Sequence, residues 1–352
     1  MATAYNSLAY SVIEASRRNN IMAIWLFSIA LMIFFMITLG GFTRLTQSGL
    51  SMVEWRPITG WLPPLTEVAW NDLFKKYQAF PEFRENNSDM NVSDFKGIFW
   101  LEYFHRLWGR IIGVAFFIPF VFFLLRGWVS FALGARLLIM FVGGGLQGVL
   151  GWYMVKSGLV DQPDVSQYRL AAHLSLALAI YCYTFWVALI LWRDGVFLHS
   201  VERITKPMTG LFFIVFVTAF SGALVAGLDA GLAYNTFPLM DGDAIPEGLF
   251  SMTPAYTNIF ENVLTVQFNH RVLAFLCLGS ALSLWFYARH INVHQSLKVA
   301  LNVLIGTLFL QAILGIFTLI FFVPTILAAG HQAGAVCVLT ACLWGLREAK
   351  GA

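Results

Sequence analysis

Long apolar stretches alternate with short polar segments along the whole chain. An α-helix needs about 20 apolar residues to cross the hydrocarbon core of a bilayer. Eight stretches reach about this length, at residues 21–42, 99–125, 135–155, 170–192, 207–228, 267–288, 299–322 and 326–344. The pattern therefore predicts an all-α integral membrane protein with eight transmembrane helices.

The composition argues against a water-soluble protein. Of the 352 residues, 59% are hydrophobic and only 12% are charged, whereas ordinary soluble domains are roughly 25% charged. The first apolar stretch is too long for the core of a signal peptide, and no Arg-rich, acid-poor presequence precedes it. We therefore expect a retained first span in a bacterial inner (plasma) membrane, with the lipid bilayer as a partner and no nucleic acid. A mitochondrial inner membrane is the second choice.

Basic residues indicate the orientation of the spans, because Lys and Arg are enriched in cytoplasmic segments. The loop 229–266 contains acidic residues but no Lys or Arg, so it is predicted to lie outside. Basic residues flank both ends of the chain, at Arg17, Arg18, Arg347 and Lys350. Both termini are therefore predicted to be cytoplasmic, as an N-terminal segment 1–20 and a C-terminal tail 347–352.

The two halves of the chain carry the same markers in the same order. The pairs are Gly40-Gly41 with Ser221-Gly222, Pro57 with Pro238, His105-Arg106 with His270-Arg271, Leu146-Gln147 with Leu310-Gln311, and His173 with His331. Because each half has four spans, a duplication gives repeats of the same orientation, related by an axis along the membrane normal. We expect two tandem four-helix bundles with pseudo-twofold symmetry, at 21–193 (including an outer loop 43–98) and 207–346, joined by a cytoplasmic linker 194–206.

Four histidines fall in the outer parts of the second, fourth, sixth and eighth spans: His105, His173, His270 and His331. A single intramembrane histidine often only bonds to a neighbouring helix, and a proton relay usually adds carboxylates along its path, which the inner halves of these spans lack. Zinc prefers four ligands, whereas a haem iron takes two axial ligands such as imidazoles. The histidines therefore predict two pockets, each binding one haem iron.

Charged residues beside these histidines supply further candidates. Arg106 and Arg271 directly follow two of them near the outer surface, where a guanidinium can pair with haem propionates; the alternative is a snorkelling anchor. Glu102 lies three residues before His105, on nearly the same helical face. It could accept a proton or orient a water molecule, or it could be an interfacial carboxylate held by an arginine.

Several segments together resemble one known family. They read GGFTRLTQSGLSM at 40–52, WRP at 55–57, EYFHRLWGR at 102–110, QFNHR at 267–271 and GHQ at 330–332. In this order they are similar to the haem A synthase family, in the branch found in mitochondria and alphaproteobacteria. The resemblance implies a membrane oxidoreductase that converts the C8 methyl group of haem O to a formyl group, which gives haem A for cytochrome oxidase assembly.

The resemblance also implies roles for the four histidines. His270 and His331 would hold the iron of a resident haem b, and His105 and His173 would hold the substrate haem O. Two imidazoles leave no open position on the substrate iron. Either one of His105 and His173 releases it during turnover, or the iron acts as an outer-sphere oxidant.

The implied partners are haem O synthase, cytochrome oxidase assembly factors and a separate electron-transfer partner, and the sequence leaves a homo-oligomer open. Two other functions fit duplicated spans. One is a dihaem b-type membrane electron-transfer subunit with two equivalent haems, and the other is a secondary transporter, which would be colourless. All four cysteines fall inside spans, so no loop disulfide is predicted.

Overall fold

The chain is almost entirely helical. The computed structural model describes residues 2–56, 59–158, 165–193 and 199–351, and within these ranges it contains no β-strand. Eight helices there are long and apolar enough to cross a membrane. They are α1 (Ala2–Leu45), α4 (Val92–Leu125), α5 (Phe131–Gly158), α6 (Gln167–Trp192), α7 (Glu202–Gly227), α9 (Val263–His290), α10 (Gln295–Ile320) and α11 (Thr325–Lys350). The predicted all-α membrane fold with eight spans is confirmed.

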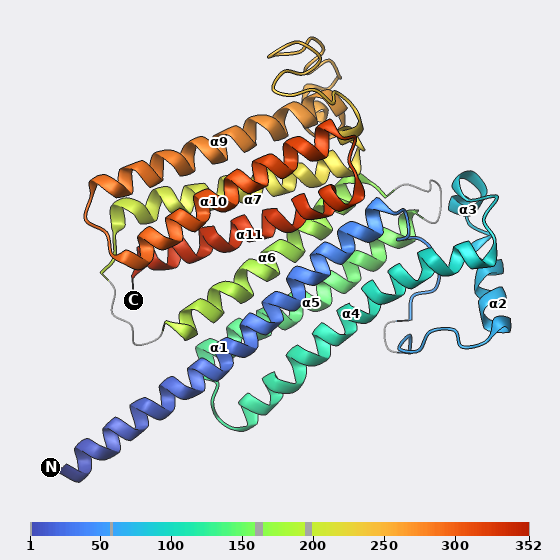
Figure 1. The fold of residues 1–352 in the computed structure, drawn as a ribbon. Helices are drawn as coiled ribbons and strands as arrows, with labels where there is room; N and C mark the ends of the chain where they lie inside the picture. Colours follow the sequence, from blue (N-terminus) through green and yellow to red (C-terminus); the bar gives the residue numbers. More distant parts are fainter. Residues whose placement is uncertain (1, 57–58, 159–164, 194–198, 352) are drawn as a thin grey trace.

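The spans run side by side along one common direction (Figure 1). Helices α1, α4, α5 and α6 form one side of the bundle, and α7, α9, α10 and α11 form the other. The two sides meet through α1 and α6, since α1 packs on α6 and α11, and α6 packs on α7 and α11. The two ends of the chain lie at the same end of the bundle (Figure 1), as an even number of spans requires. The pseudo-twofold axis and the cytoplasmic location of the termini stay predictions.

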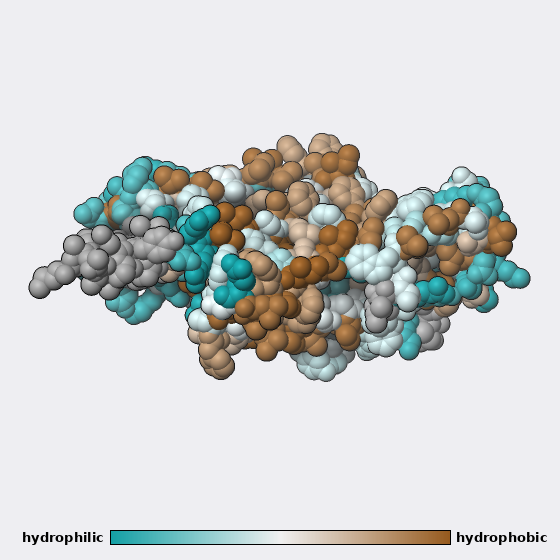
Figure 2. All heavy atoms as spheres, turned by 90° about the horizontal axis from the view of Figure 1, so that it is seen from below, coloured by the Kyte–Doolittle hydropathy of each residue, from teal (hydrophilic) through white to brown (hydrophobic). Residues whose placement is uncertain are grey.

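Apolar side chains form a broad zone around the middle of the molecule, and polar side chains gather toward its two ends (Figure 2). Many large apolar side chains of the spans are exposed, among them Leu31, Phe117, Leu146 and Phe275. A soluble protein rarely exposes a contiguous apolar surface of this kind. The surface therefore fits a multi-pass protein whose middle zone contacts lipid.

All eight membrane helices begin before the predicted spans, and α1 and α4 do so by the largest margins. α1 starts at Ala2, so the described part of the predicted segment 1–20 is helical. α4 starts at Val92 because Asn91 and Asp94 form a capping box that satisfies free backbone N–H groups of its first turn. Pro57 and residues 194–198 of the predicted linker lie outside the described residues.

The last helix, α11, continues to Lys350 through most of the predicted tail 347–352. The reason is a buried carboxylate near its end. The side chain of Glu348 is 1% exposed, forms an ion pair with Arg193 and accepts a hydrogen bond from Ser296 Oγ at 2.6 Å. Because Arg193 follows α6 and Ser296 lies on α10, these contacts tie three helices together and keep the C-terminal turn ordered.

The predicted outer loop 43–98 contains two helices that the sequence pattern did not predict, α2 (Glu67–Tyr77) and α3 (Pro81–Asn86). They lie at the end of the bundle opposite the termini (Figure 1). Buried aromatic side chains join α2 to the first turns of α4: Trp70, Phe74, Tyr77, Phe95, Phe99 and Tyr103. We call residues 67–86 the outer cap, after the side on which the sequence predicts them to lie. A second segment with the same predicted location connects α7 to α9 and contains the short helix α8 (Asn258–Glu261).

Glu82 is a buried acid in the outer cap. It lies on α3 and is 3% exposed, and among the described residues its Oε2 atom has no hydrogen-bond partner. Burial, reinforced by the nearby carboxylate of Glu102, raises the pKa of Glu82 to about 8. An exposed glutamate titrates near 4.3. The folded cap therefore holds Glu82 protonated at neutral pH, whereas the unfolded cap would ionise it.

The cap is expected to lose stability as the pH rises from about 4.3 to about 8. Over this interval the unfolded cap releases a proton that the folded cap retains, and each pKa unit of difference is worth about 1.4 kcal/mol. Hydrogen exchange of the α2 and α3 amides against pH measures the effect. Glu82→Gln should remove most of this pH dependence, whereas Glu85→Gln, an exposed position on the same helix, should retain it. Wild-type exchange protection that does not change with pH would contradict the expectation.

Candidate functional site

The histidines of the second half form a facing pair. His270 on α9 and His331 on α11 have ring centroids 6.4 Å apart, with their planes 86° apart. An imidazole nitrogen binds a first-row metal at about 2 Å, so two rings on opposite sides of one iron have centroids roughly 6 Å apart. The Nδ1 atom of His270 is buried and has no hydrogen-bond partner among the described residues. The spacing of this pair fits two axial ligands of one haem iron.

The histidines of the first half, His105 on α4 and His173 on α6, lie close enough to interact electrostatically. Within the described part of the chain they form no ring contact like that of the second pair. In the same residues, no three His, Cys, Asp or Glu side chains gather as a metal-ion site. The structure thus offers imidazole pairs rather than the four-ligand clusters that zinc prefers.

A glycine faces each of the four histidines from a neighbouring span. A Cβ atom added at that glycine would approach the imidazole more closely than ordinary van der Waals contact allows. The pairs and distances are Gly40 to His105 (3.2 Å), Gly151 to His173 (2.9 Å), Gly222 to His270 (3.1 Å) and Gly315 to His331 (2.7 Å). Glycine is therefore needed at these positions to leave room for the rings.

These contacts show that one predicted alignment between the two halves of the chain is off by one residue. The sequence comparison aligned Gly40 with Ser221, whereas by its contact with a histidine Gly40 matches Gly222. The register was ambiguous because adjacent small residues occur in both halves. Gly41 instead faces Gln332, whose amide oxygen would lie 2.5 Å from a Cβ at Gly41.

Gly315→Ala is expected to displace the His331 ring and to lower the occupancy of the haem predicted for the second pocket at least tenfold, because changes around metal ligands typically cost 10- to 100-fold in affinity. The added Cβ would lie 2.7 Å from Cε1 and 3.2 Å from Nδ1 of the ring. Haem content per purified protein measures the effect. Gly306→Ala is the matched control on the same helix, since nothing lies within 4 Å of its Cβ position. Equal haem content in the two variants would refute the steric role.

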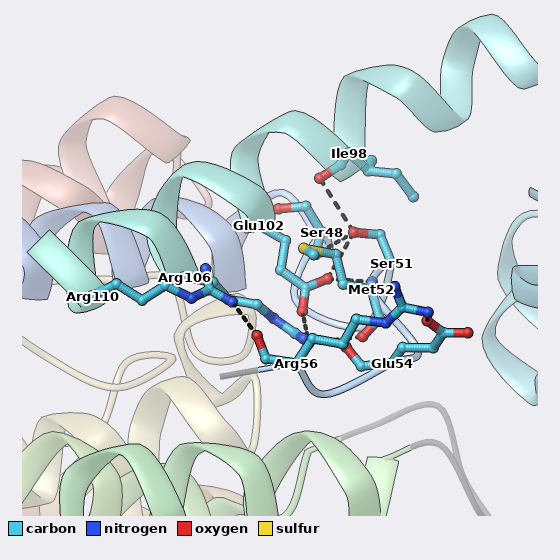
Figure 3. A network of polar contacts seen from close by, with 9 residues as sticks. All are labelled: Ser48, Ser51, Met52, Glu54, Arg56, Ile98, Glu102, Arg106 and Arg110. Carbon is cyan, nitrogen blue, oxygen red and sulfur yellow. Dashed lines mark hydrogen bonds and ion pairs between the residues drawn. The ribbon is translucent and has the colours of Figure 1, made fainter. Parts of the chain in front are cut away.

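Glu102 and Arg106 fasten the start of the first outer loop to α4 (Figure 3). Glu102, with its side chain 4% exposed, accepts hydrogen bonds at Oε2 from Ser51 Oγ (2.7 Å) and the Met52 N–H (2.6 Å), and its Oε1 pairs with Arg106. Arg106 also donates to the carbonyl oxygens of Met52 (2.7 Å) and Glu54 (2.9 Å). These contacts match the alternative reading of Glu102 as a carboxylate held by an arginine.

Gln267 and Arg271 make the corresponding clamp in the second half. Arg271 donates to the carbonyl oxygens of Tyr234 (2.7 Å) and Thr236 (2.9 Å), and also to Oε1 of Gln267. The amide nitrogen of Gln267 donates to the carbonyl oxygens of Ala230 and Ala233. Both arginines predicted to pair with haem propionates thus donate to loop carbonyls in this structure. Their propionate role stays a prediction.

Contacts that the sequence did not predict join the two halves. Gln332, which directly follows His331, donates from Nε2 to the carbonyl oxygen of Ile37 on α1 at 2.7 Å. At the outer end, Arg44 donates to Asp229 at 3.3 Å. Gln332 belongs to the GHQ segment noted in the sequence, so its place in that motif was the only signal of a role. These bonds fix α1 against α11 and α7.

A model of the COX15-CtaA family, described as cytochrome oxidase assembly protein, matches residues 23–343. The chain belongs to the COX15-CtaA family. Its relatives include the protein named "Heme A synthase" of Nitrosomonas eutropha, 47% identical over 351 residues that cover 97% of this chain and 98% of the relative. The protein of the same name from Nitrosospira multiformis is 50% identical over 332 residues, covering 94% and 93%. "Heme A synthase COX15" of Arabidopsis thaliana is 44% identical over 339 residues, covering 92% and 73%.

Membership of the COX15-CtaA family confirms the resemblance seen in the sequence motifs. The two bacterial relatives named "Heme A synthase" and the plant relative named "Heme A synthase COX15" each match nearly the whole chain. The matched residues 23–343 include all or part of each of the eight spans, and they contain all four histidines. The four cysteines are free and lie within spans rather than in a loop.

Proposed function

We propose that this chain is a haem A synthase, which oxidises the C8 methyl group of haem O to a formyl group and so supplies haem A for cytochrome oxidase assembly. The observation that carries the proposal is the match of nearly the whole chain to proteins named "Heme A synthase". The two imidazole pairs agree with it. A dihaem electron-transfer subunit has no support among these relatives.

In this proposal, His270 and His331 hold a resident haem b. Their 6.4 Å centroid spacing and the glycines facing both rings support this assignment. When bound, haem b supplies one-electron transfer. The contact of Gln332 supports the proximity of the two pockets. Gln332 follows His331 and bonds to the carbonyl of Ile37 on α1. Ile37 lies three residues before Gly40, which faces His105.

His105 and His173 bind the iron of the substrate haem O. Their role is orientation: two helix-borne imidazoles, each packed against a glycine, would set the plane of the macrocycle. Glu102 and Arg106 act on the outer side of this pocket by holding residues 51–54 against α4. Because both oxygens of Glu102 are engaged, we assign it a positioning role; it could accept a proton only by breaking this clamp.

The proposal includes a location and partners. The chain would lie in a bacterial inner membrane with both termini cytoplasmic, which agrees with the two ends lying at one end of the bundle (Figure 1). Haem O synthase would supply the substrate and oxidase assembly factors would take the product. A separate protein would exchange electrons with the chain.

Pigment analysis tests the proposed function. Membranes that contain the chain and a source of haem O should yield haem A or its hydroxylated intermediate. His105→Ala and His270→Ala should yield neither. Unchanged haem O beside the wild-type chain, with haem b in two equivalent copies, would overturn the proposal in favour of an electron carrier.

A further inference from the structure

The two halves of the chain meet at two equivalent helix contacts, in which the last span of one half packs on the first span of the other: α11 on α1, and α6 on α7. In the first contact, Gln332 directly follows His331 and lies against Gly41. A Cβ atom at Gly41 would lie 2.5 Å from the amide oxygen of Gln332. The amide nitrogen donates to the carbonyl oxygen of Ile37 on α1 at 2.7 Å. This contact is therefore polar, and it needs glycine on α1.

The second contact has the same plan and a different chemistry. Leu174 directly follows His173 on α6, and Ala223 directly follows Gly222 on α7. Leu174 packs against an apolar cluster that contains Ala223. Neither side chain has a polar atom, so they cannot form a hydrogen bond between the helices. The repeat thus has an apolar pair at one contact between its halves, and a glutamine with a glycine at the other.

Packing alone does not require a glutamine at the contact of α11 with α1. Leucine and alanine join the helices at the equivalent contact, and a polar side chain inside a membrane span is rare unless it has a function. The position of Gln332 indicates the function. It adjoins His331 of the second pair, and the turn of α1 that it holds leads to Gly40, whose Cβ position lies 3.2 Å from Nε2 of His105. The hydrogen bond of Gln332 thus lies between the two pairs of histidines.

The part of α1 that contains Gly40 and Gly41 is a weak helical segment by itself. Glycine is a poorer helix former than every other residue except proline, and α1 ends soon afterwards, at Leu45. At another level of the span, α1 is tied to the helix of His105, because the indole N–H of Trp108 on α4 donates to a carbonyl oxygen of α1 at 2.9 Å. Gln332 holds the glycine segment from the side of the second half. Contacts from both halves therefore order this segment.

We propose that Gln332 couples the two pockets: a haem held by His331 orders the segment of α1 at Gly40 and thereby strengthens the binding of haem O beside His105. This inference rests on the proposed function. A ligand that orders a segment lowers the ordering cost for a second ligand, which gives positive cooperativity. The coupling is equal in both directions, so haem O also strengthens binding in the resident pocket. Gln332 is thus a positioning residue, which acts on the substrate pocket through α1.

Titration of the purified chain with haem O, with and without the haem b proposed for the second pocket, tests the coupling. His331→Ala provides the chain with an empty second pocket, and it should weaken haem O binding roughly fivefold, the lower end of typical couplings between sites. The double variant Gly41→Ala, Gln332→Leu copies the pair found at the contact of α6 with α7, so it keeps an apolar packing. In this background, His331→Ala should cause no further loss of haem O binding.

The ratio of the two affinities separates coupling from structural support. If Gln332 only packs α11 against α1, the double variant lowers both affinities and keeps the fivefold ratio, which overturns the proposal. Equal affinities in the wild type and in His331→Ala also overturn it. Arg44→Gln is the matched control, because it removes another bond from α1 to the second half, whose partner Asp229 lies just after α7. This control should keep the ratio.

Hydrogen exchange at residues 37–44 gives a second readout, without haem O. Haem b should protect these amides in the wild type relative to His331→Ala, and it should not protect them in the double variant at full haem b content. Protection that still rises with haem b in the double variant refutes the coupling. A double variant that loses haem b refutes it as well, because Gln332 would then serve the resident pocket itself.

A shorter side chain keeps the test available if the double variant does not accumulate. Gln332→Asn retains the amide and draws it back from the Ile37 carbonyl, so it should lower the affinity ratio and the protection by haem b in the same way. An unchanged ratio in Gln332→Asn counts against the proposal. Haem O that stays unconverted beside the wild-type chain would instead refute the proposed function, whereas the exchange comparison with haem b does not depend on conversion.

Discussion

His331→Ala is expected to leave the purified protein without the haem b that we propose for His270 and His331, a loss of more than 100-fold in affinity, because even partners of metal ligands are worth 10- to 100-fold. His331 contributes one ring of the pair at 6.4 Å, and its Nδ1 is bonded to the Gln311 carbonyl at 3.2 Å. Alanine removes the ligand and leaves the facing surface at Gly315 open. The haem-to-protein ratio after solvent extraction measures the loss.

The control for this experiment is another histidine of the same bundle. His290 ends α9, is exposed, and bonds through Nδ1 to the Phe286 carbonyl at 2.8 Å. His290→Ala should keep the full haem content. If His331→Ala also keeps it, the resident haem lies elsewhere and the assignment of His270 and His331 is wrong. A loss in both variants would point to general unfolding, which thermal melting of the two proteins would reveal.

The eight spans could be predicted because the bilayer allows few solutions. A stretch of about 20 apolar residues without water must satisfy its backbone internally, as a helix does. The ends of α4 and α11 could not be predicted this way, since they depend on the Asn91 cap and on the burial of Glu348. The outer cap was missed because its helices are short, and their packing relies on aromatic residues far apart in sequence.

The candidate site shows the same division. The histidines could be recognised because an ionisable side chain inside a membrane span is rare and usually functional. The loop partners of Arg106 and Arg271 were not visible, because these partners are backbone carbonyls 32 to 54 residues away. A carbonyl has no sequence signature. The different surroundings of His173 and His331 were hidden for another reason: the repeat presents the same Gln and His, and only the contacts separate them.

Glu102→Gln is expected to lower conversion of haem O about tenfold while haem O stays bound at the pocket proposed for His105 and His173. The carboxylate accepts from Ser51 Oγ and the Met52 N–H. A glutamine at this position would place its amide N–H group opposite either these two donors or the guanidinium of Arg106, so two donors would face each other in both orientations. A buried donor without an acceptor costs about 1–3 kcal/mol. Gln267 avoids this conflict because its amide faces the carbonyls of Ala230 and Ala233. Conversion and hydrogen exchange at residues 48–54 measure the two consequences together.

A double variant separates positioning from proton transfer. Ser51→Ala removes one of the two donors that oppose the glutamine amide, so in the Glu102→Gln background it should restore part of the exchange protection and part of the conversion. If Glu102 is instead the proton acceptor, the double variant stays inactive even where the loop is again protected, because neither side chain can take up a proton. Ser51→Ala alone leaves the bonds from Met52 and Arg106 in place, and it should cost less than Glu102→Gln. Thus recovery of conversion with loop protection identifies Glu102 as a positioning residue, and protection without conversion identifies it as a catalytic one.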